Sequence, residues 1–215
     1  MNPRYSRFLL ITVVVWLFSL CASAFAAETA ATRTILIVGD SLTAGYGLPD
    51  PATQAYPALL QAKLDALPAP GWRIVNAGVS GDTTSGGLRR IDWVTRQPIA
   101  VLVLALGAND GLRGLPLELI RSNLSAIVNK VRAKNPQVRV LLAGMRMPSS
   151  MGDYAGDYAR LYPALAQAEK WGLVPFLLED VGGVADLNQA DGIHPNESGH
   201  KIMAEKVWPH LLVLL

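Results

Sequence analysis

Two segments of this 215-residue sequence carry side chains suited to nucleophilic catalysis. Ser41 follows Gly39 and Asp40 at the end of a short apolar run, where a hydroxyl can project free of a strand and a helix start favours an oxyanion. Asp191 stands three residues before His194. A carboxylate at that distance can hydrogen-bond one ring nitrogen, so the other nitrogen is free to take a proton from a serine. The two segments therefore predict a nucleophile with an acid–base pair, although Asp40 and Ser41 alone would also suit a helix N-cap.

Two further segments could stabilise negative charge on a substrate oxygen. The segment 76–83 contains glycines, which can offer an unobstructed backbone N–H to a ligand. Asn109 follows a fully apolar run, and its side-chain amide could donate to an oxyanion. Each segment also has an ordinary explanation, a plain loop at 76–83 and an Asx turn at Asn109. The presence of all four segments in one chain favours the catalytic interpretation.

The elements that must position these residues alternate between strand and helix. Apolar runs rich in branched residues predict strands at 34–38, 73–79, 99–106, 138–143 and 173–177. Helical spacing of apolar residues predicts helices at 54–67, 84–97, 117–134 and 158–170, and a last helix that begins at Pro195. This alternation is typical of an α/β fold with a five-stranded parallel sheet between two helical layers. In such sheets ligands bind beyond the carboxyl ends of the strands, where the candidate residues fall.

The first 27 residues differ from the rest of the sequence. Arg4 and Arg7 precede an apolar run over 8–20, and two Ala-x-Ala patterns follow it. This layout predicts a secretory signal peptide over 1–27, cleaved near 24–27. The apolar run is shorter than the roughly 20 residues that a membrane-spanning helix needs. A retained membrane anchor and lipidation of the adjacent cysteine are the alternatives.

The remaining residues, 28–215, suit one domain with a substantial core. The sequence holds 19 basic and 17 acidic residues, and Arg4 and Arg7 account for the excess. A balanced mature chain gives no indication of nucleic acid as a partner. Cys21 is the only cysteine, so the mature chain would carry no disulfide and no thiolate metal site.

The histidines do not suggest a metal site, and no cofactor motif is evident. His194 and His200 would need further ligands at suitable spacing, and the sequence offers no convincing set. His200 and His210 fall within the last predicted helix, and we expect both on its surface.

The four polar segments together resemble the four sequence blocks of the SGNH (GDSL) hydrolase family. They read Gly-Asp-Ser-Leu at 39–42, Ser-Gly-Asp-Thr at 80–83, Gly-Ala-Asn-Asp at 107–110 and Asp-Gly-Ile-His-Pro at 191–195. A closer similarity, to the periplasmic thioesterase/lysophospholipase/arylesterase group of Gram-negative bacteria, is carried by 39–46, 109–114 and 174–176.

The resemblance implies a role for each residue of the site. Ser41 would be the nucleophile and, through its own N–H, one oxyanion donor. Gly81 would give a second N–H, and Asn109 would give the third donor through its side chain. His194 would be the general base, oriented by Asp191. The resemblance also implies a three-layer α/β/α sandwich with a flavodoxin-like strand order, 2-1-3-4-5.

The function implied is a serine esterase that cleaves ester or thioester bonds of acyl substrates, lysophospholipids included, through an acyl-enzyme on Ser41. Leu112, Leu115, Met147 and Tyr154 could line an apolar groove for the acyl chain, or could equally close the end of the core. A carbohydrate O-deacetylase and a non-catalytic periplasmic lipid-binding protein are the alternatives. We expect a monomer without cofactor in the periplasm, or exported further, with no membrane anchor after signal cleavage.

Overall fold

Short apolar segments of the chain form five parallel strands in one sheet. The strands are β1 (Arg33–Gly39), β2 (Trp72–Gly78), β3 (Val101–Ala105), β4 (Arg139–Ala143) and β5 (Gly172–Val174). Their order is β2-β1-β3-β4-β5, and every neighbouring pair is parallel. The predicted sheet and its order are therefore confirmed. All of β3 is buried, as expected for a central strand that is covered on both faces.

The structure, a computed structural model, describes residues 32–69 and 71–215. The predicted signal peptide and Cys21 lie outside the described residues. Thr32–Leu215 form one compact unit. Within the described part of the chain, no helix is both long and apolar enough to cross a membrane.

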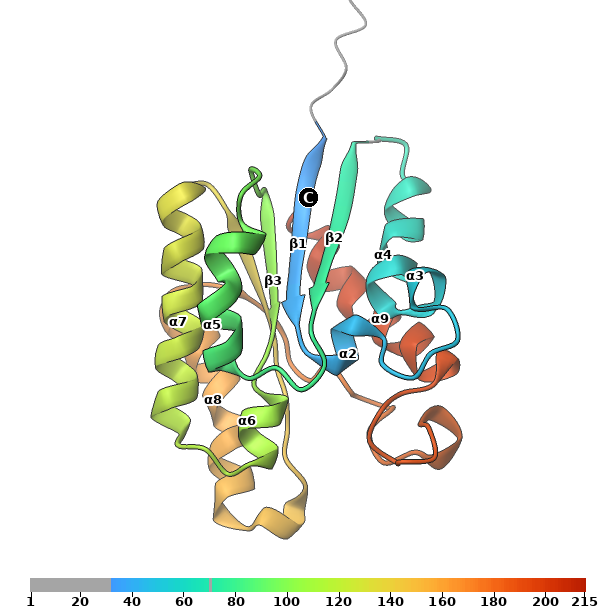
Figure 1. Ribbon diagram of the computed structural model, residues 1–215, viewed down its shortest axis with the longest axis vertical. Helices are drawn as coiled ribbons and strands as arrows, with labels where there is room; N and C mark the ends of the chain where they lie inside the picture. Colours follow the sequence, from blue (N-terminus) through green and yellow to red (C-terminus); the bar gives the residue numbers. More distant parts are fainter. Residues whose placement is uncertain (1–31, 70) are drawn as a thin grey trace, which may run out of the picture. The chain divides into compact units, whose positions relative to one another are not determined.

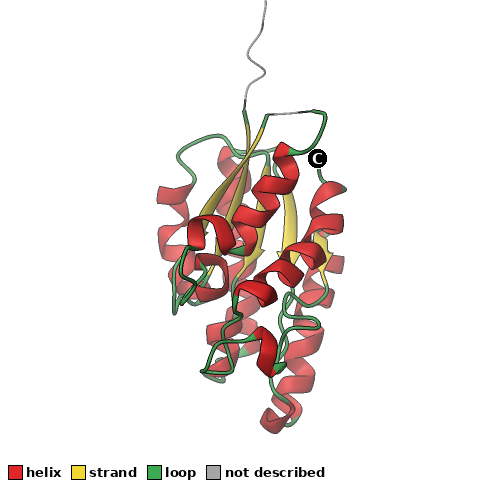
Figure 2. Cartoon of the chain, turned by 90° about the vertical axis from the view of Figure 1, so that its right-hand side faces the viewer, coloured by secondary structure: helices red, strands yellow, loops and turns green. Residues whose placement is uncertain are grey.

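Helices cover both faces of the sheet. One layer holds α4 (Tyr56–Asp65) and α9 (Glu197–Leu212), and the other holds α5 (Thr84–Val94), α7 (Leu117–Lys134) and α8 (Asp153–Glu169). Figure 1 shows the two groups on either side of the strands, and Figure 2 shows the same layers after a quarter turn. The predicted α/β/α sandwich is confirmed, and the carboxyl ends of its strands all point to one edge.

The helix α7 follows directly from its apolar spacing. Its bounds match the predicted helix at 117–134. The side chains at helical spacing along one face are buried: Ile120, Leu124, Ile127, Val128 and Val131. This stripe packs α7 into the core beside α5, so the sequence pattern alone accounts for the position of the helix.

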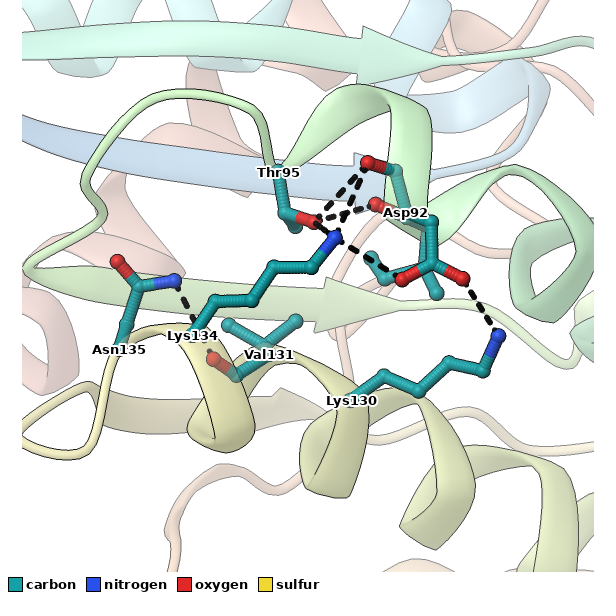
Figure 3. Close-up of polar contacts among 7 residues, drawn as sticks. Asp92, Thr95, Lys130, Val131, Lys134 and Asn135 are labelled. Atoms are coloured by element: carbon teal, nitrogen blue, oxygen red, sulfur yellow. Dashed lines mark hydrogen bonds and ion pairs between the residues drawn. The ribbon is translucent and has the colours of Figure 1, made fainter.

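Polar contacts join the ends of α5 and α7 (Figure 3). The Asp92 carboxylate of α5 accepts hydrogen bonds from Lys130 at 2.6 Å and from Lys134 at 3.0 Å, and these bonds lower the pKa of Asp92. Asn135, which ends α7, accepts a hydrogen bond from the buried Ile99 N–H at 2.8 Å through its Oδ1. These contacts fix the entry into β3, whose far end leads to Asn109.

Several elements differ from the predictions. The strand predicted at 173–177 ends as β5 at Val174, because Pro175 has no N–H to donate to the sheet. Helix α8 begins at Asp153 rather than at 158, and the added residues 153–157 could not be predicted from an apolar stripe because none of them is fully buried. Five short helices were not predicted, because they span less than two turns and leave no periodic pattern. They are α2 (Ser41–Ala44), α3 (Pro51–Gln54), α6 (Ala108–Leu112) and the 3₁₀ helices η1 (Ser149–Met151) and η2 (Ala185–Leu187).

Candidate active site

Ser41 is the first residue of α2. Figure 1 shows α2 directly beyond the end of β1. Asp40 caps the helix, and its Oδ1 accepts a hydrogen bond from the Leu42 N–H at 3.0 Å. The turn is tight: a Cβ on Gly39 would lie 1.9 Å from the Oγ1 atom of Thr43. Glycine therefore lets the chain turn sharply here, and the turn carries Ser41 to the carboxyl edge of the sheet.

The Asp40 carboxyl lies next to the serine in sequence but is itself buried, with 1% of its surface exposed. Burial raises the pKa of Asp40 to about 6, and the hydrogen bond from Leu42 opposes this shift only in part. Because a buried carboxylate is costly, Asp40 is more readily protonated than an ordinary aspartate.

The predicted acid–base pair lies in direct contact with the serine. His194 Nε2 is 3.0 Å from Ser41 Oγ, and His194 Nδ1 is 2.6 Å from Asp191 Oδ2. Asp191 Oδ1 also accepts the backbone N–H groups of His194 at 3.0 Å and of Ile193 at 2.9 Å. The hydrogen bonds from His194, backbone and side chain, together with that from Ile193 lower the pKa of Asp191 to about 2. An ionised Asp191 holds the proton on Nδ1, so Nε2 can accept the proton of the serine hydroxyl.

Two residues that the sequence analysis missed hold the histidine loop. The ring of Tyr46 lies against the ring of His194, with their centroids 4.7 Å apart. Gln189 donates through its side-chain amide to the carbonyls of Tyr46 at 2.6 Å and Pro195 at 3.0 Å, and its backbone N–H donates to the His194 carbonyl at 2.7 Å. Tyr46 and Gln189 stand 143 residues apart, so no local pattern links them.

Gly81 and Asn109, the other two predicted oxyanion donors, come from the loop after β2 and from α6, beyond the same edge of the sheet. Gly81 has a φ of +78°, a conformation that favours glycine. Asn109 lies in α6, and its Nδ2 donates to the backbone carbonyl of Asp82 at 3.0 Å. Because an amide nitrogen carries two hydrogens, this bond leaves the second one for a ligand. The structure thus joins Asn109 to the residue that follows Gly81.

Two buried tyrosines of α8 support the turn that precedes Asn109. Tyr158 donates to the carbonyl of Gly107 at 2.7 Å, and Tyr162 donates to that of Leu106 at 2.9 Å. Gly107 has a φ of +118°, and a Cβ there would lie 2.0 Å from the Tyr162 hydroxyl. Glycine is therefore needed at this position for both its conformation and its small size.

A buried polar cluster fixes the other side of α6. Both carboxylate oxygens of Asp110 accept from Thr84, one from its N–H at 2.9 Å and one from its hydroxyl at 2.6 Å. Asn123 of α7 in turn donates to the Thr84 hydroxyl oxygen at 3.0 Å. The cluster ties α6 to the start of α5 and to α7, so the helix that carries Asn109 is held from two sides.

The four residues predicted to line a substrate groove gather around the end of α6. Tyr154 donates through its hydroxyl to the Leu115 carbonyl at 2.7 Å. Met147 packs against Gly111, since a Cβ added to Gly111 would lie 2.5 Å from the Met147 sulfur. Leu112 is 50% exposed. The cluster is therefore apolar and partly open to solvent, and its members Leu112 and Leu115 follow shortly after Asn109 in the chain.

His200 is not a surface residue, so that prediction was wrong. It is 1% exposed, and its Nδ1 accepts the Tyr56 N–H at 3.2 Å. The two rings are nearly parallel, with centroids 6.4 Å apart. His200 is buried because it belongs to the same stripe of α9 as Met203 and Val207. Among residues 32–69 and 71–215, no group of three His, Cys, Asp or Glu side chains could hold a metal ion.

Comparison with known proteins gives a consistent result. Residues 37–202 match the GDSL-like Lipase/Acylhydrolase family. Esterase TesA of Pseudomonas aeruginosa is 43% identical over 190 residues, which cover 87% of this chain and 92% of the relative. The thioesterase 1/protease 1/lysophospholipase L1 of Escherichia coli K12 is 39% identical over 181 residues, 83% of each chain. A crystal structure of TesA superposes with a TM-score of 0.79 at 43% identity, covering 85% of this chain and all of the other.

Proposed function

The chain belongs to the GDSL-like lipase/acylhydrolase family and is a serine esterase, and from that membership we propose that Ser41, His194 and Asp191 perform its ester hydrolysis. The observation that carries this assignment is the pair of contacts from Ser41 Oγ to His194 Nε2 and from His194 Nδ1 to Asp191 Oδ2. Among residues 32–69 and 71–215, no other histidine forms a hydrogen bond with a serine hydroxyl.

In the first half of the reaction Ser41 Oγ attacks the carbonyl carbon of an ester or thioester. His194 Nε2 takes the hydroxyl proton as the new C–O bond forms, and Asp191 stabilises the resulting imidazolium. The tetrahedral intermediate then collapses, the bond to the leaving oxygen or sulfur breaks, and His194 gives its proton to the departing alcohol or thiol. This leaves an acyl group on Ser41.

In the second half, water takes the place of the alcohol. His194 removes a proton from the water, whose oxygen attacks the acyl carbon, and the proton returns to Ser41 as the free acid leaves. In both halves the negative oxygen would rest between the N–H groups of Ser41 and Gly81 and the amide of Asn109. Loss of one such donor typically lowers kcat by about 10²–10³-fold.

We propose an acyl ester, an acyl thioester or a lysophospholipid as the substrate, with its chain over Leu112, Leu115, Met147 and Tyr154. The support is the half-exposed Leu112 close to Asn109 and the relatives named thioesterase, lysophospholipase and arylesterase. Methionine suits such a surface because its flexible thioether adapts to irregular apolar ligands.

The test is hydrolysis of p-nitrophenyl esters from acetyl to palmitoyl by the purified protein and its Ser41→Ala variant. We expect activity that depends on Ser41 and peaks at medium or long chains. Leu112→Ser should lower kcat/KM about tenfold for the long esters and leave the acetyl ester unchanged, since it removes apolar contact area. The matched control is Leu119→Ser, which changes an exposed leucine that lies on α7 instead of α6.

Each contrary result would refute a different part of the proposed function. Activity that survives Ser41→Ala would refute the assigned nucleophile. A peak at the acetyl ester would instead favour a carbohydrate O-deacetylase. Equal effects of the Leu112 and Leu119 substitutions would refute the proposed acyl surface.

We further propose that residues 1–27 are an export signal and that the domain 28–215 acts in the periplasm as a monomer without a membrane anchor. The support is the basic start, the short apolar run and the Ala-x-Ala patterns of that segment. Amino-terminal sequencing of protein from a periplasmic extract should give a start near residues 25–28. An uncleaved chain in the membrane fraction would refute the proposal.

A further inference from the structure

An ion pair beside the candidate site takes no part in the proposed reaction. Arg90 of α5 donates through Nε to Asp82 Oδ2 at 2.7 Å. The side chains of Arg90 and Asp82 are only 20% and 10% exposed. Because water screens such a pair poorly, its geometry is held far more firmly than that of an ion pair on the surface.

Asp82 stands where two of the proposed oxyanion donors meet. It directly follows Gly81, whose N–H is one donor. Its backbone carbonyl accepts the Nδ2 of Asn109 at 3.0 Å, and Asn109 is the second donor. A displacement of Asp82 would therefore move the Gly81 N–H and release the amide of Asn109 together.

Arg90 also contacts the chain two residues before the third donor. Its Nη2 donates to the carbonyl of Gly39 at 3.1 Å, and the same carbonyl accepts the Val79 N–H at 3.0 Å. Gly39 lies two residues before Ser41, whose N–H is the remaining donor. One guanidinium thus contacts both the end of β1 and the loop after β2.

The local sequence of α5 makes room for this contact. Gly86 and Arg90 are four residues apart, so they lie on the same face of the helix. A Cβ on Gly86 would lie 1.7 Å from Asp82 Oδ1. The glycine therefore allows the Asp82 carboxylate to pack against the first turn of α5, within reach of Arg90.

We propose that Arg90 is a positioning residue that sets the spacing of the three oxyanion donors through Asp82 and Gly39. An oxyanion site works because its donors are already aimed at the place where charge develops, and a displacement of about 1 Å can cost about 10²-fold in rate. The planar fork of arginine can donate to two acceptors at once, whereas a lysine ammonium is a point charge on a flexible stem. The inference rests on the proposed roles of Ser41, Gly81 and Asn109.

The experiment is a double-mutant cycle on the full-length protein. kcat and KM for a p-nitrophenyl ester are measured for Arg90→Met, Asn109→Ala and the double variant, together with the melting temperature of each. Arg89→Met, at the neighbouring exposed arginine of the same helix, is the matched control. Arg90→Lys and Asp82→Asn provide second variants that preserve most of the packing if Arg90→Met does not fold.

We expect Arg90→Met to lower kcat about 10²-fold and to change KM by less than about threefold, because the lost interaction acts on the transition state. In the Asn109→Ala background, Arg90→Met should lower kcat less than about tenfold, since one of the donors that Arg90 positions is already gone. Arg90→Lys should recover only part of the loss, and Arg89→Met should match the wild type.

Equal losses from Arg90→Met in both backgrounds would overturn the inference, and so would a folded variant with normal kcat. A purely structural role would lower the melting temperature of Arg90→Met without any coupling to Asn109. If Asn109→Ala and Ser41→Ala themselves leave kcat intact, the proposed function fails first. If those two variants are inactive but the cycle is additive, the positioning role of Arg90 alone is refuted.

Discussion

The buried imidazole of His200 should make the protein less stable in acid, and His200→Asn should remove that effect. His200 is 1% exposed and accepts the Tyr56 N–H through Nδ1. Burial, with the nearby charge of His194 as a second cause, lowers the pKa of His200 to about 4. Asparagine can offer its Oδ1 in place of Nδ1 but takes up no proton, so the substitution separates the hydrogen bond from the titration.

The magnitude follows from the two pKa values. An unfolded histidine has a pKa of 6.5, against about 4 in the folded protein. Between these values the unfolded chain binds a proton that the folded protein does not, so the free energy of unfolding falls as the pH falls from 6.5 to 4. At about 1.4 kcal/mol per pKa unit, the His200 contribution lost by pH 4 is about 3 kcal/mol.

The assay is urea unfolding at pH 7 and pH 4 for the wild type and His200→Asn, with His210→Asn on the same helix as the matched control. The wild type should lose about 3 kcal/mol more unfolding free energy between the two pH values than His200→Asn does. The absolute stability of the variant does not matter, because only the difference between pH values is compared. Parallel pH dependence in the wild type and His200→Asn would refute a buried, neutral His200.

Two carboxylates give further predictions, one for stability and one for turnover. Burial raises the pKa of Asp40 from 3.8 to about 6, so the folded protein loses stability as the pH rises through that window. Asp40→Asn should therefore gain about 2 kcal/mol relative to the wild type between pH 4 and pH 7 in the same urea measurements, and an unchanged difference would contradict it. Asp191→Asn should lower kcat about 10³–10⁴-fold, because an amide no longer holds the His194 tautomer that accepts the serine proton. Steady-state kinetics against the exposed control Asp186→Asn test this, and a kcat within tenfold of the wild type would remove Asp191 from the mechanism.

The residues proposed for catalysis can be picked out from the sequence for a physical reason. Ser41, Asn109 and His194 lie in short polar segments next to buried strands or before a long helix, where polar side chains are conspicuous. Asp191 is close enough in sequence to His194 for the pairing to be read from spacing alone, and the contact at 2.6 Å agrees with it. The long helices and the buried strands could also be predicted. A helix buried on one side has apolar residues at helical spacing, and a strand buried on both faces has an unbroken apolar run.

The supporting residues could not be predicted in the same way. Arg90 lies in an ordinary amphipathic helix, and its contact with Gly39 spans 51 residues. The one available signal was a pair of glycines, Gly86 and Gly87, inside a helix where glycine is unfavourable. His200 is predicted on the surface because it falls within the last helix, although its spacing from Met203 and Val207 places it on the buried stripe of α9.

These supporting contacts share one physical origin. Beyond the carboxyl edge of a parallel sheet the chain runs through loops whose carbonyls have no strand partner, and a buried carbonyl without a hydrogen bond is costly. Side chains from neighbouring elements donate to such carbonyls: Asn109 to Asp82, Tyr158 to Gly107 and Gln189 to Tyr46. At the end of β1, Arg90 adds a second donor to the carbonyl of Gly39. Each of these donors also fixes a segment that adjoins one of the proposed catalytic residues. The need to satisfy the edge of the sheet and the need to hold the site rigid are thus met by the same bonds. Substitutions at these positions should therefore impair turnover even where they touch no substrate.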